Sequence, residues 1–171
     1  MTDSRNQTAR AYRIGHNGMA ALLALSCLLT LLPLQARAEY SYSADGSELT
    51  DSTTQLTWRR CVEGMSWSGS TCTGTAATYS HQAALQRASS EATASKAWRM
   101  PNVLELSSIT QRAVARNPSI DTTAFPGTPS LYFWTSTPFV GDARRAWSIY
   151  FSDGQIFREP RTNTYYVRLV R

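Results

Sequence analysis

Residues 145–159 read RAWSIYFSDGQIFRE, and this stretch decides which kind of fold the chain can form. Apolar side chains alternate on both sides of Asp153-Gly154, a dipeptide that favours a two-residue β-hairpin turn. With these two residues at the centre of the turn, Tyr150 lies opposite Phe157 on one face. The other face is the better core candidate and carries Trp147, Ile149, Phe151 and Ile156. The same register places Arg158 on the core side, which a bulge or an early strand end would relieve.

The sequence around this hairpin predicts more strands. Short runs rich in aromatic and β-branched residues, separated by Pro, Gly and Asp, predict strands over 132–137, 145–151, 155–159 and 164–171. A further strand is expected over 53–59, with Leu56 and Trp58 on one face. Residues 39–50 are polar with little periodicity, so we interpret them as a leader into a domain that spans 51–171.

Two helices are expected between the early strand and the later ones. The first begins near Ser80, and one of its sides carries His81, Leu85, Ala88 and Ala92. The second begins after Asn102, because Asn is a good N-cap and Glu105 stands three residues on, as in a capping box. This helix is expected to end before Asn117 and to bury Leu106, Ile109 and Ala113.

The order of these elements predicts the fold class. Helices come first and strands follow, with no regular alternation of the two. This order is typical of an α+β fold, here a single compact domain with two helices and then a mainly antiparallel sheet.

The first 38 residues differ from the rest and resemble a secretory signal peptide. Arginines precede an apolar run over 19–34, and Ala36-Arg37-Ala38 forms a small-x-small cleavage site. The alternative is a membrane anchor, but the run is shorter than the roughly 20 residues that a spanning helix needs. We therefore expect export to the periplasm, the cell surface or the medium, with no membrane span after cleavage.

Charge and cysteine content narrow the function classes. The whole chain has a formal charge of +5, but residues 39–171 carry only thirteen basic and eleven acidic side chains, so net charge gives no reason to expect nucleic-acid binding. Cleavage would remove Cys27 and leave Cys61 and Cys72, an even pair that in an exported chain indicates a disulfide. A zinc site is disfavoured because His81 is the only other Cys or His left.

Taken together, the motifs resemble the Lcl C-terminal domain family of exported bacterial domains, long without a known function. The resemblance covers about residues 48–171 and rests on an ordered set: Leu56-x-Trp58-x-x-Cys61, Cys72-x-Gly74, Trp98-Arg99-Met100-Pro101-Asn102-x-x-Glu105-Leu106, Phe125-Pro126, Phe133-Trp134-Thr135-Ser136-Thr137, Ala146-Trp147-x-Ile149-x-Phe151-x-Asp153-Gly154 and Tyr166-Val167-Arg168-Leu169-Val170-Arg171.

The resemblance implies a C-type-lectin-like arrangement in which the first and last strands pair. It also implies a relation to the end domain of a collagen-like adhesin, which is associated with trimerisation and with binding sulfated glycosaminoglycans. This chain has no Gly-x-y repeat, so the resemblance leaves its oligomeric state open. It also lacks the Glu-Pro-Asn and Trp-Asn-Asp signatures of calcium-dependent sugar binding.

Two groups of residues are candidate ligand-binding sites. Arg144, Arg145, Arg158 and Arg161 fall on the two strands of the hairpin, and clustered guanidinium groups bind sulfate, phosphate or carboxylate. The alternative is a solvated face partly neutralised by Asp142 and Glu159. Tyr150 and Phe157 would form an exposed aromatic face for a sugar ring or a protein partner, or else a second core layer under a helix.

We therefore expect a non-enzymatic exported binding module without cofactor or metal, which recognises an anionic, sulfated glycan or another surface polymer. A second hypothesis is an envelope structural protein that docks a protein partner on its aromatic face. A third is an enzyme that uses Cys61 as a free thiol, as the lectin-like formylglycine-generating enzymes use cysteines. A catalytic triad is not indicated, because His81 has no acidic neighbour close in sequence.

Overall fold

A five-stranded sheet occupies one end of the part described by the computed structural model, which covers residues 40–113 and 116–171. Its neighbours are antiparallel except for the parallel pair β10 and β7. In order across the sheet, its strands are β6 (Thr78–Tyr79), β10 (Tyr165–Tyr166), β7 (Tyr132–Pro138), β8 (Arg145–Tyr150) and β9 (Gln155–Pro160). The later strands were therefore predicted closely, apart from the short β10.

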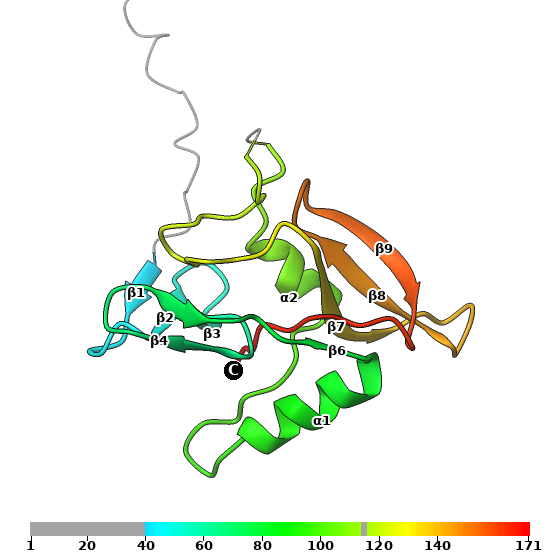
Figure 1. Ribbon diagram of the computed structural model, residues 1–171, viewed down its shortest axis with the longest axis horizontal. Coiled ribbons are helices and arrows are strands. Elements are labelled where there is room, and N and C mark those ends of the chain that lie inside the picture. The colour runs from blue at the N-terminus through cyan, green and yellow to red at the C-terminus, as the bar shows by residue number, and fades with distance from the viewer. Residues whose placement is uncertain (1–39, 114–115) are drawn as a thin grey trace, which may run out of the picture. The chain divides into compact units, whose positions relative to one another are not determined.

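The N-terminal half of this part forms two smaller sheets. Antiparallel strands β1 (Tyr40–Tyr42), β2 (Glu48–Asp51) and β3 (Thr57–Arg59) form one, and β4 (Met65–Trp67) and β5 (Cys72–Gly74) form the other. The expected disulfide between Cys61 and Cys72 joins β5 to the segment that follows β3. In Figure 1 the strands β1 to β4 lie at one end of the view and the β8–β9 hairpin at the other, with the red C-terminal segment running between them.

Residues 40–51 correct the sequence interpretation. We expected a leader without regular structure over 39–50, yet β1 and β2 lie there and Leu49 is buried. The polar composition concealed these strands because two of the buried positions of β2 are the acidic residues Glu48 and Asp51. The strand expected over 53–59 is also shorter than predicted, since residues 52–54 form the turn between β2 and β3. The proposed signal peptide, residues 1–38, lies outside the described residues.

Two helices are present where they were predicted. Helix α1 (His81–Glu91) begins at Ser80, whose side chain accepts the Ala83 N–H, and it buries His81, Ala84 and Ala88. Helix α2 (Val103–Ser108) has the predicted capping box between Asn102 and Glu105. Neither is long and apolar enough to cross a membrane. The α+β class is confirmed, although six strands precede the helices where one was expected.

Helix α2 ends earlier than predicted. It stops at Ser108, and Ile109 is its C-cap, so only Leu106 and Ile109 of the expected apolar face are buried. Ala113 lies beyond the helix and is exposed. After the helix the chain reverses direction, and the backbones of Thr110 and Ile120 form an antiparallel bridge across this reversal.

The hairpin register differs from the prediction by two residues. Tyr150 lies opposite Gln155, and Ser148, not Tyr150, lies opposite Phe157. The turn is longer because buried Phe151 leaves the ladder, and its backbone bonds to Leu131 and Ser119 instead of to β9. A shift of two residues keeps every side chain on its predicted face. Arg158 is exposed without a bulge, since it lies on β9 at the edge of the sheet.

Both faces of the sheet are covered, by two separate groups of buried side chains. Phe133 and Ile149 belong to a group that includes Leu106 of α2 and Trp58 of β3. Trp134 and Ala146 belong to a second group, with Ala84 and Ala88 of α1. Trp58, Trp98 and Trp134 are buried as expected. The expectation that Trp147 is a core residue is wrong, because Trp147 is half-buried against Phe139.

The C-terminal segment connects these layers. Through β10 it pairs with β6 and β7, and a few residues later Val170 bridges to Trp58 and Arg99. Between these two contacts lies Arg168, which is fully buried. Its guanidinium donates to the carbonyl oxygens of Arg59 and Arg60, at 2.9 and 2.5 Å, and to Thr128 Oγ1 at 2.7 Å.

Arg168 is a cation whose hydrogen-bond partners are backbone and hydroxyl oxygens and not a carboxylate. Its guanidinium also lies over the Phe125 ring, 4.7 Å from the centroid. Burial lowers the pKa of Arg168 to about 9, which still leaves the side chain charged at neutral pH. The side chain therefore holds the last strand to the β3 segment at the cost of burying a charge.

We expect Arg168→Met to lower the free energy of unfolding by about 2–5 kcal/mol, because it leaves buried carbonyl oxygens without donors. Urea unfolding of the variant and of the parent protein measures this difference. Arg116→Met, at an exposed arginine, is the control and should change the value by less than about 0.5 kcal/mol. An unchanged or higher stability of the Arg168 variant would mean that burying the charge costs more than its hydrogen bonds contribute.

Candidate functional site

The structure brings the predicted arginines together at the base of the β8–β9 hairpin. Arg145 pairs with Pro160 across the two strands, and the Arg161 N–H donates to the Arg144 carbonyl at 2.9 Å. The Arg161 Nε donates to the Arg145 carbonyl at 3.2 Å, and Arg145 Nη1 donates to the Arg158 carbonyl at 3.1 Å. We call Arg144, Arg145, Arg158 and Arg161 the hairpin arginines.

A cavity of about 350 Å³ opens beside the hairpin arginines. It is lined by Asp142, Arg144, Arg145, Pro160 and Thr162. Asp142 accepts hydrogen bonds from Arg144 Nε and Nη2, at 3.1 and 3.2 Å, and lies 3.7 Å from Arg145 Nε. These bonds, above all those from Arg144, hold the pKa of Asp142 below its ordinary value. The Arg144 side chain is still 90% exposed, so it is open to an external anion.

The charge at the hairpin base is not balanced. Asp142 is the carboxylate that pairs with these arginines in the described residues, and it meets only Arg144 and Arg145. Glu159, which was expected to neutralise the same face, accepts instead from the Tyr165 hydroxyl and from Asn163. The four guanidinium groups therefore leave an excess of positive charge at this end of the sheet.

Tyr150 and Phe157 belong to a larger aromatic group that also includes Tyr132 and Tyr165. Tyr150 stacks on Tyr132 with 4.5 Å between ring centroids, and Tyr132 stacks on Tyr165 at 4.9 Å. Phe157 meets Tyr132 edge-on at 5.6 Å. All four side chains are half-buried, so they are neither a fully exposed face nor a covered core layer. We call Tyr165, Tyr132 and Tyr150 the tyrosine row.

Sequence reasoning missed Tyr132, although it joins the predicted aromatic residues to one another. Strand alternation over 132–137 would have placed Tyr132 on the same face as Trp134, but the pairing of β7 with both β8 and β10 was not predictable. Partial burial, followed by the charge of Glu159, raises the pKa of Tyr132, so its hydroxyl remains protonated. The row thus offers stacked aromatic rings that carry hydroxyl groups.

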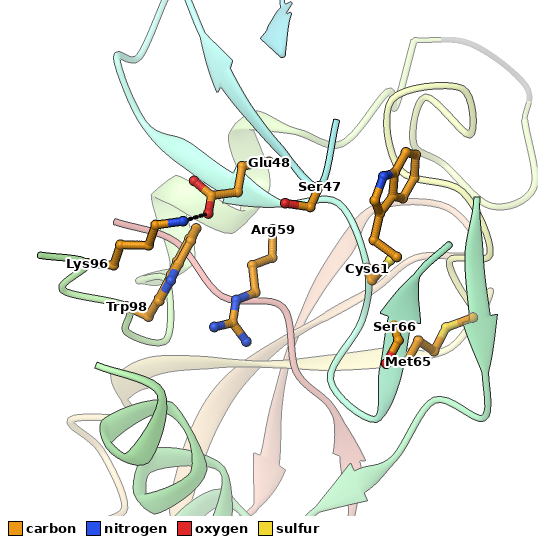
Figure 2. Close-up of a pocket in the computed structure, with 9 residues that line it drawn as sticks. Ser47, Glu48, Arg59, Cys61, Met65, Ser66, Lys96 and Trp98 are labelled. Carbon is orange, nitrogen blue, oxygen red and sulfur yellow. Dashed lines mark hydrogen bonds and ion pairs between the residues drawn. The ribbon is translucent and has the colours of Figure 1, made fainter. Parts of the chain in front are cut away.

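A second cavity, of about 320 Å³, was not predicted and lies near the disulfide (Figure 2). Lys96, Arg59, Glu48 and Trp98 contribute polar and aromatic groups, and Cys61, Met65 and Ser66 lie opposite them in the view. Glu48 accepts from Lys96 and from Arg171. Burial opposes ionisation of Glu48, but these two cations outweigh it and lower its pKa.

The cations of this second cavity are compensated. Arg59 pairs with Glu63 at 3.1 Å and with Glu91 at 2.7 Å, and Arg87 pairs with the same two carboxylates. This closed ring of four side chains joins β3 to α1. Because the carboxylates there nearly equal the cations in number, an anion gains less at this cavity than at the hairpin arginines.

The two residues considered for catalysis, Cys61 and His81, both contribute to the folded structure. Cys61 is bonded to Cys72 and is not a free thiol. His81 is buried beneath α1, its Nε2 lies 3.0 Å from the Thr135 carbonyl, and its ring meets Trp134 edge-on at 5.1 Å. Burial is the main effect that lowers the pKa of His81. The Thr135 hydrogen bond opposes this shift and the charge of Arg161 adds to it.

The described residues form a small α+β module that carries one disulfide. A family model described as the Lcl C-terminal domain matches residues 47–171, and the chain belongs to this family. Membership suggests an exported, adhesin-like module, and the disulfide is consistent with export. A search of the curated proteins finds no match.

The buried state of His81 predicts a specific pH dependence of stability. Its folded pKa lies below the unfolded value of about 6.5, so the unfolded chain binds more protons at mildly acidic pH. Stability is then fully present above pH 6.5 and falls toward pH 5, by up to about 1.4 kcal/mol per pH unit.

His81→Gln should reduce this loss, because a Gln amide can donate to the Thr135 carbonyl but does not titrate. The measurement is the free energy of unfolding of both proteins in urea at pH 7, 6 and 5. Equal differences between pH 7 and pH 5 in the two proteins would contradict the assignment of His81 as a neutral core residue.

Proposed function

We propose that this protein is a non-enzymatic exported module that binds an anionic glycan, in particular a sulfated one, through the hairpin arginines. The observation that carries the proposal is their excess of positive charge beside an open cavity. The ion pairs of the second cavity compensate its cations, which is why that cavity is not the preferred site.

The chemistry of the guanidinium group favours oxyanions with several oxygens. A guanidinium donates two parallel N–H bonds, which match the oxygen spacing of a sulfate or a carboxylate. Asp142 already accepts from Arg144 Nε and Nη2 in this way. A sulfate group would take the place of the Asp142 carboxylate, and Thr162 at the cavity edge supplies a hydroxyl.

The tyrosine row supports a second contact with the same ligand. Aromatic rings pack against the apolar faces of sugar rings, and the hydroxyl groups of Tyr can bond sugar hydroxyls. An envelope structural protein that docks a protein partner on this face is the alternative function. Glycan binding and protein docking differ in their salt dependence, since burial of aromatic surface is far less sensitive to salt than ion pairing.

A C-type-lectin-like arrangement is part of the proposal. It is supported by the antiparallel bridge between Trp58 and Val170, which joins an early strand to the end of the chain. In this proposal the protein is exported and acts in the periplasm, at the cell surface or in the medium. The location of the glycan decides which of these it is.

We expect the protein to bind an immobilised sulfated polysaccharide saturably, with an affinity that falls as salt rises. Arg144→Gln with Arg145→Gln should weaken binding on the order of tenfold to a hundredfold at low salt, because two charge-assisted contacts are lost. The double variant should also show a shallower salt dependence. A salt series with surface plasmon resonance measures both effects.

Arg116→Gln serves as the matched control, since it removes the same charge at an exposed position elsewhere. Equal binding by the double variant and the parent protein would contradict the proposed site. Absence of binding at low salt would contradict the function, and salt-insensitive association with an envelope protein would favour the alternative.

The proposal makes an opposite prediction for Asp142. Its carboxylate competes with an external anion for Arg144 and Arg145, so Asp142→Asn should tighten polysaccharide binding by several-fold while preserving the size of the side chain. The same salt series detects the change. Weaker binding would mean that Asp142 orients the arginines for a ligand, and unchanged binding would mean that Asp142 does not compete with the anion.

A further inference from the structure

An apolar loop tip, formed by Phe139 and Val140, projects next to the hairpin arginines, and neither residue lines the cavity there. It belongs to residues 139–144, which read FVGDAR and connect β7 to β8. Val140 is 98% exposed, the largest exposure among the large apolar side chains of the described residues. Figure 1 shows this loop extending past the end of β9. Single exposed apolar side chains are common on protein surfaces, so the position of Val140 among cations, and not its exposure alone, is what distinguishes it.

The tip is held in one conformation. The Phe139 N–H donates to the Arg145 carbonyl, and the Arg145 N–H donates to the Asp142 carbonyl at 2.9 Å. The Phe139 ring meets Trp147 edge-on at 5.4 Å. Gly141 lies against that ring, where an added Cβ would approach Phe139 Cζ to 2.8 Å. Folding of Phe139 against the strand thus leaves Val140 directed outward.

Positive charge surrounds the tip. Arg144 is the last residue of the same loop. Arg158 lies over the Phe139 ring, with its Cζ 5.4 Å from the ring centroid. Arg145 is linked to the Arg158 carbonyl. Asp142 is the carboxylate that pairs with two of these three arginines. The surface around Val140 therefore carries about two net positive charges.

We propose that the loop 139–144 docks on an anionic lipid surface, with Val140 entering the bilayer interface and the arginines contacting lipid phosphates. An apolar side chain surrounded by cations matches the two layers of such a surface, apolar chains beneath anionic headgroups. A polysaccharide provides the anions but no apolar layer for Val140. This inference goes beyond the proposed function, which requires the arginines and not the tip.

The test uses the protein recovered after export from an expressing bacterium, with its N-terminus determined by mass spectrometry. Co-sedimentation is measured with vesicles of phosphatidylcholine alone and with vesicles to which phosphatidylglycerol is added as the anionic lipid. The protein should sediment with the anionic vesicles and not with the neutral ones. Absence of binding to anionic vesicles overturns the proposal.

Variants of the tip separate insertion from simple charge attraction. Val140→Ser should lower the vesicle partition coefficient by about tenfold, and Val140→Trp should raise it, which a merely destabilised variant would not do. Leu131→Ser is the matched control, because Leu131 is 48% exposed at the opposite end of β7. Equal partitioning of all three variants overturns the role of Val140.

The polysaccharide assay distinguishes this inference from the proposed function. Val140→Ser should leave binding to the sulfated polysaccharide unchanged, whereas the Arg144 and Arg145 variants weaken both activities. Loss of polysaccharide binding in the Val140 variant would assign the tip to the glycan site and overturn the lipid proposal. Vesicle binding without any polysaccharide binding would support the lipid surface and contradict the glycan function.

Discussion

The rest of the structure depends on the way in which the last seven residues are held between two sheets. Their backbone pairs with β7 on one side and with the Trp58 and Arg99 backbones on the other. The fully buried guanidinium of Arg168 joins these contacts by binding two successive carbonyl oxygens of the β3 segment. A lysine could not reach both carbonyls and Thr128 from one planar group. Burying this cation costs free energy. The hydrogen bonds that it donates to the two carbonyl oxygens and to Thr128 offset this cost, because these buried acceptors would otherwise need water as a donor.

This connection explains why the candidate site is rigid. The five-stranded sheet is packed on both faces, with Phe133 and Ile149 on one side and Trp134 and Ala146 on the other. The β8–β9 hairpin therefore has a fixed base from which its arginines project. Arg145 and Arg161 donate to backbone carbonyls within the group, and the Asp142 carboxylate accepts from Arg144. Preformed sites lose little entropy on binding. The module thus presents charge from a stable sheet edge, with an apolar tip beside it.

The sequence predicted those features that depend on local patterns. Capping by Asn102 and Glu105, the strands of the hairpin and the pairing of Cys61 with Cys72 follow from short-range chemistry. The exact register did not, because Phe151 packs into a core formed by distant residues. For the same reason β1 and β2 were missed, as was the place of Tyr132 between β8 and β10. The grouping of the arginines was predictable from the hairpin alone, but the withdrawal of Glu159 toward Tyr165 was not.

The most direct test of the account is an NMR titration of the arginine side chains with a sulfated oligosaccharide. The account predicts that the Nε–Hε signals of Arg144 and Arg145 shift first and saturate together, because their guanidinium groups line the open cavity. The Nε–Hε signal of Arg168 should stay unchanged, since that side chain is fully buried and its two Nη atoms are bonded within the protein. Shifts confined to Arg59, which lines the cavity near the disulfide, would contradict this prediction and place the anion site there.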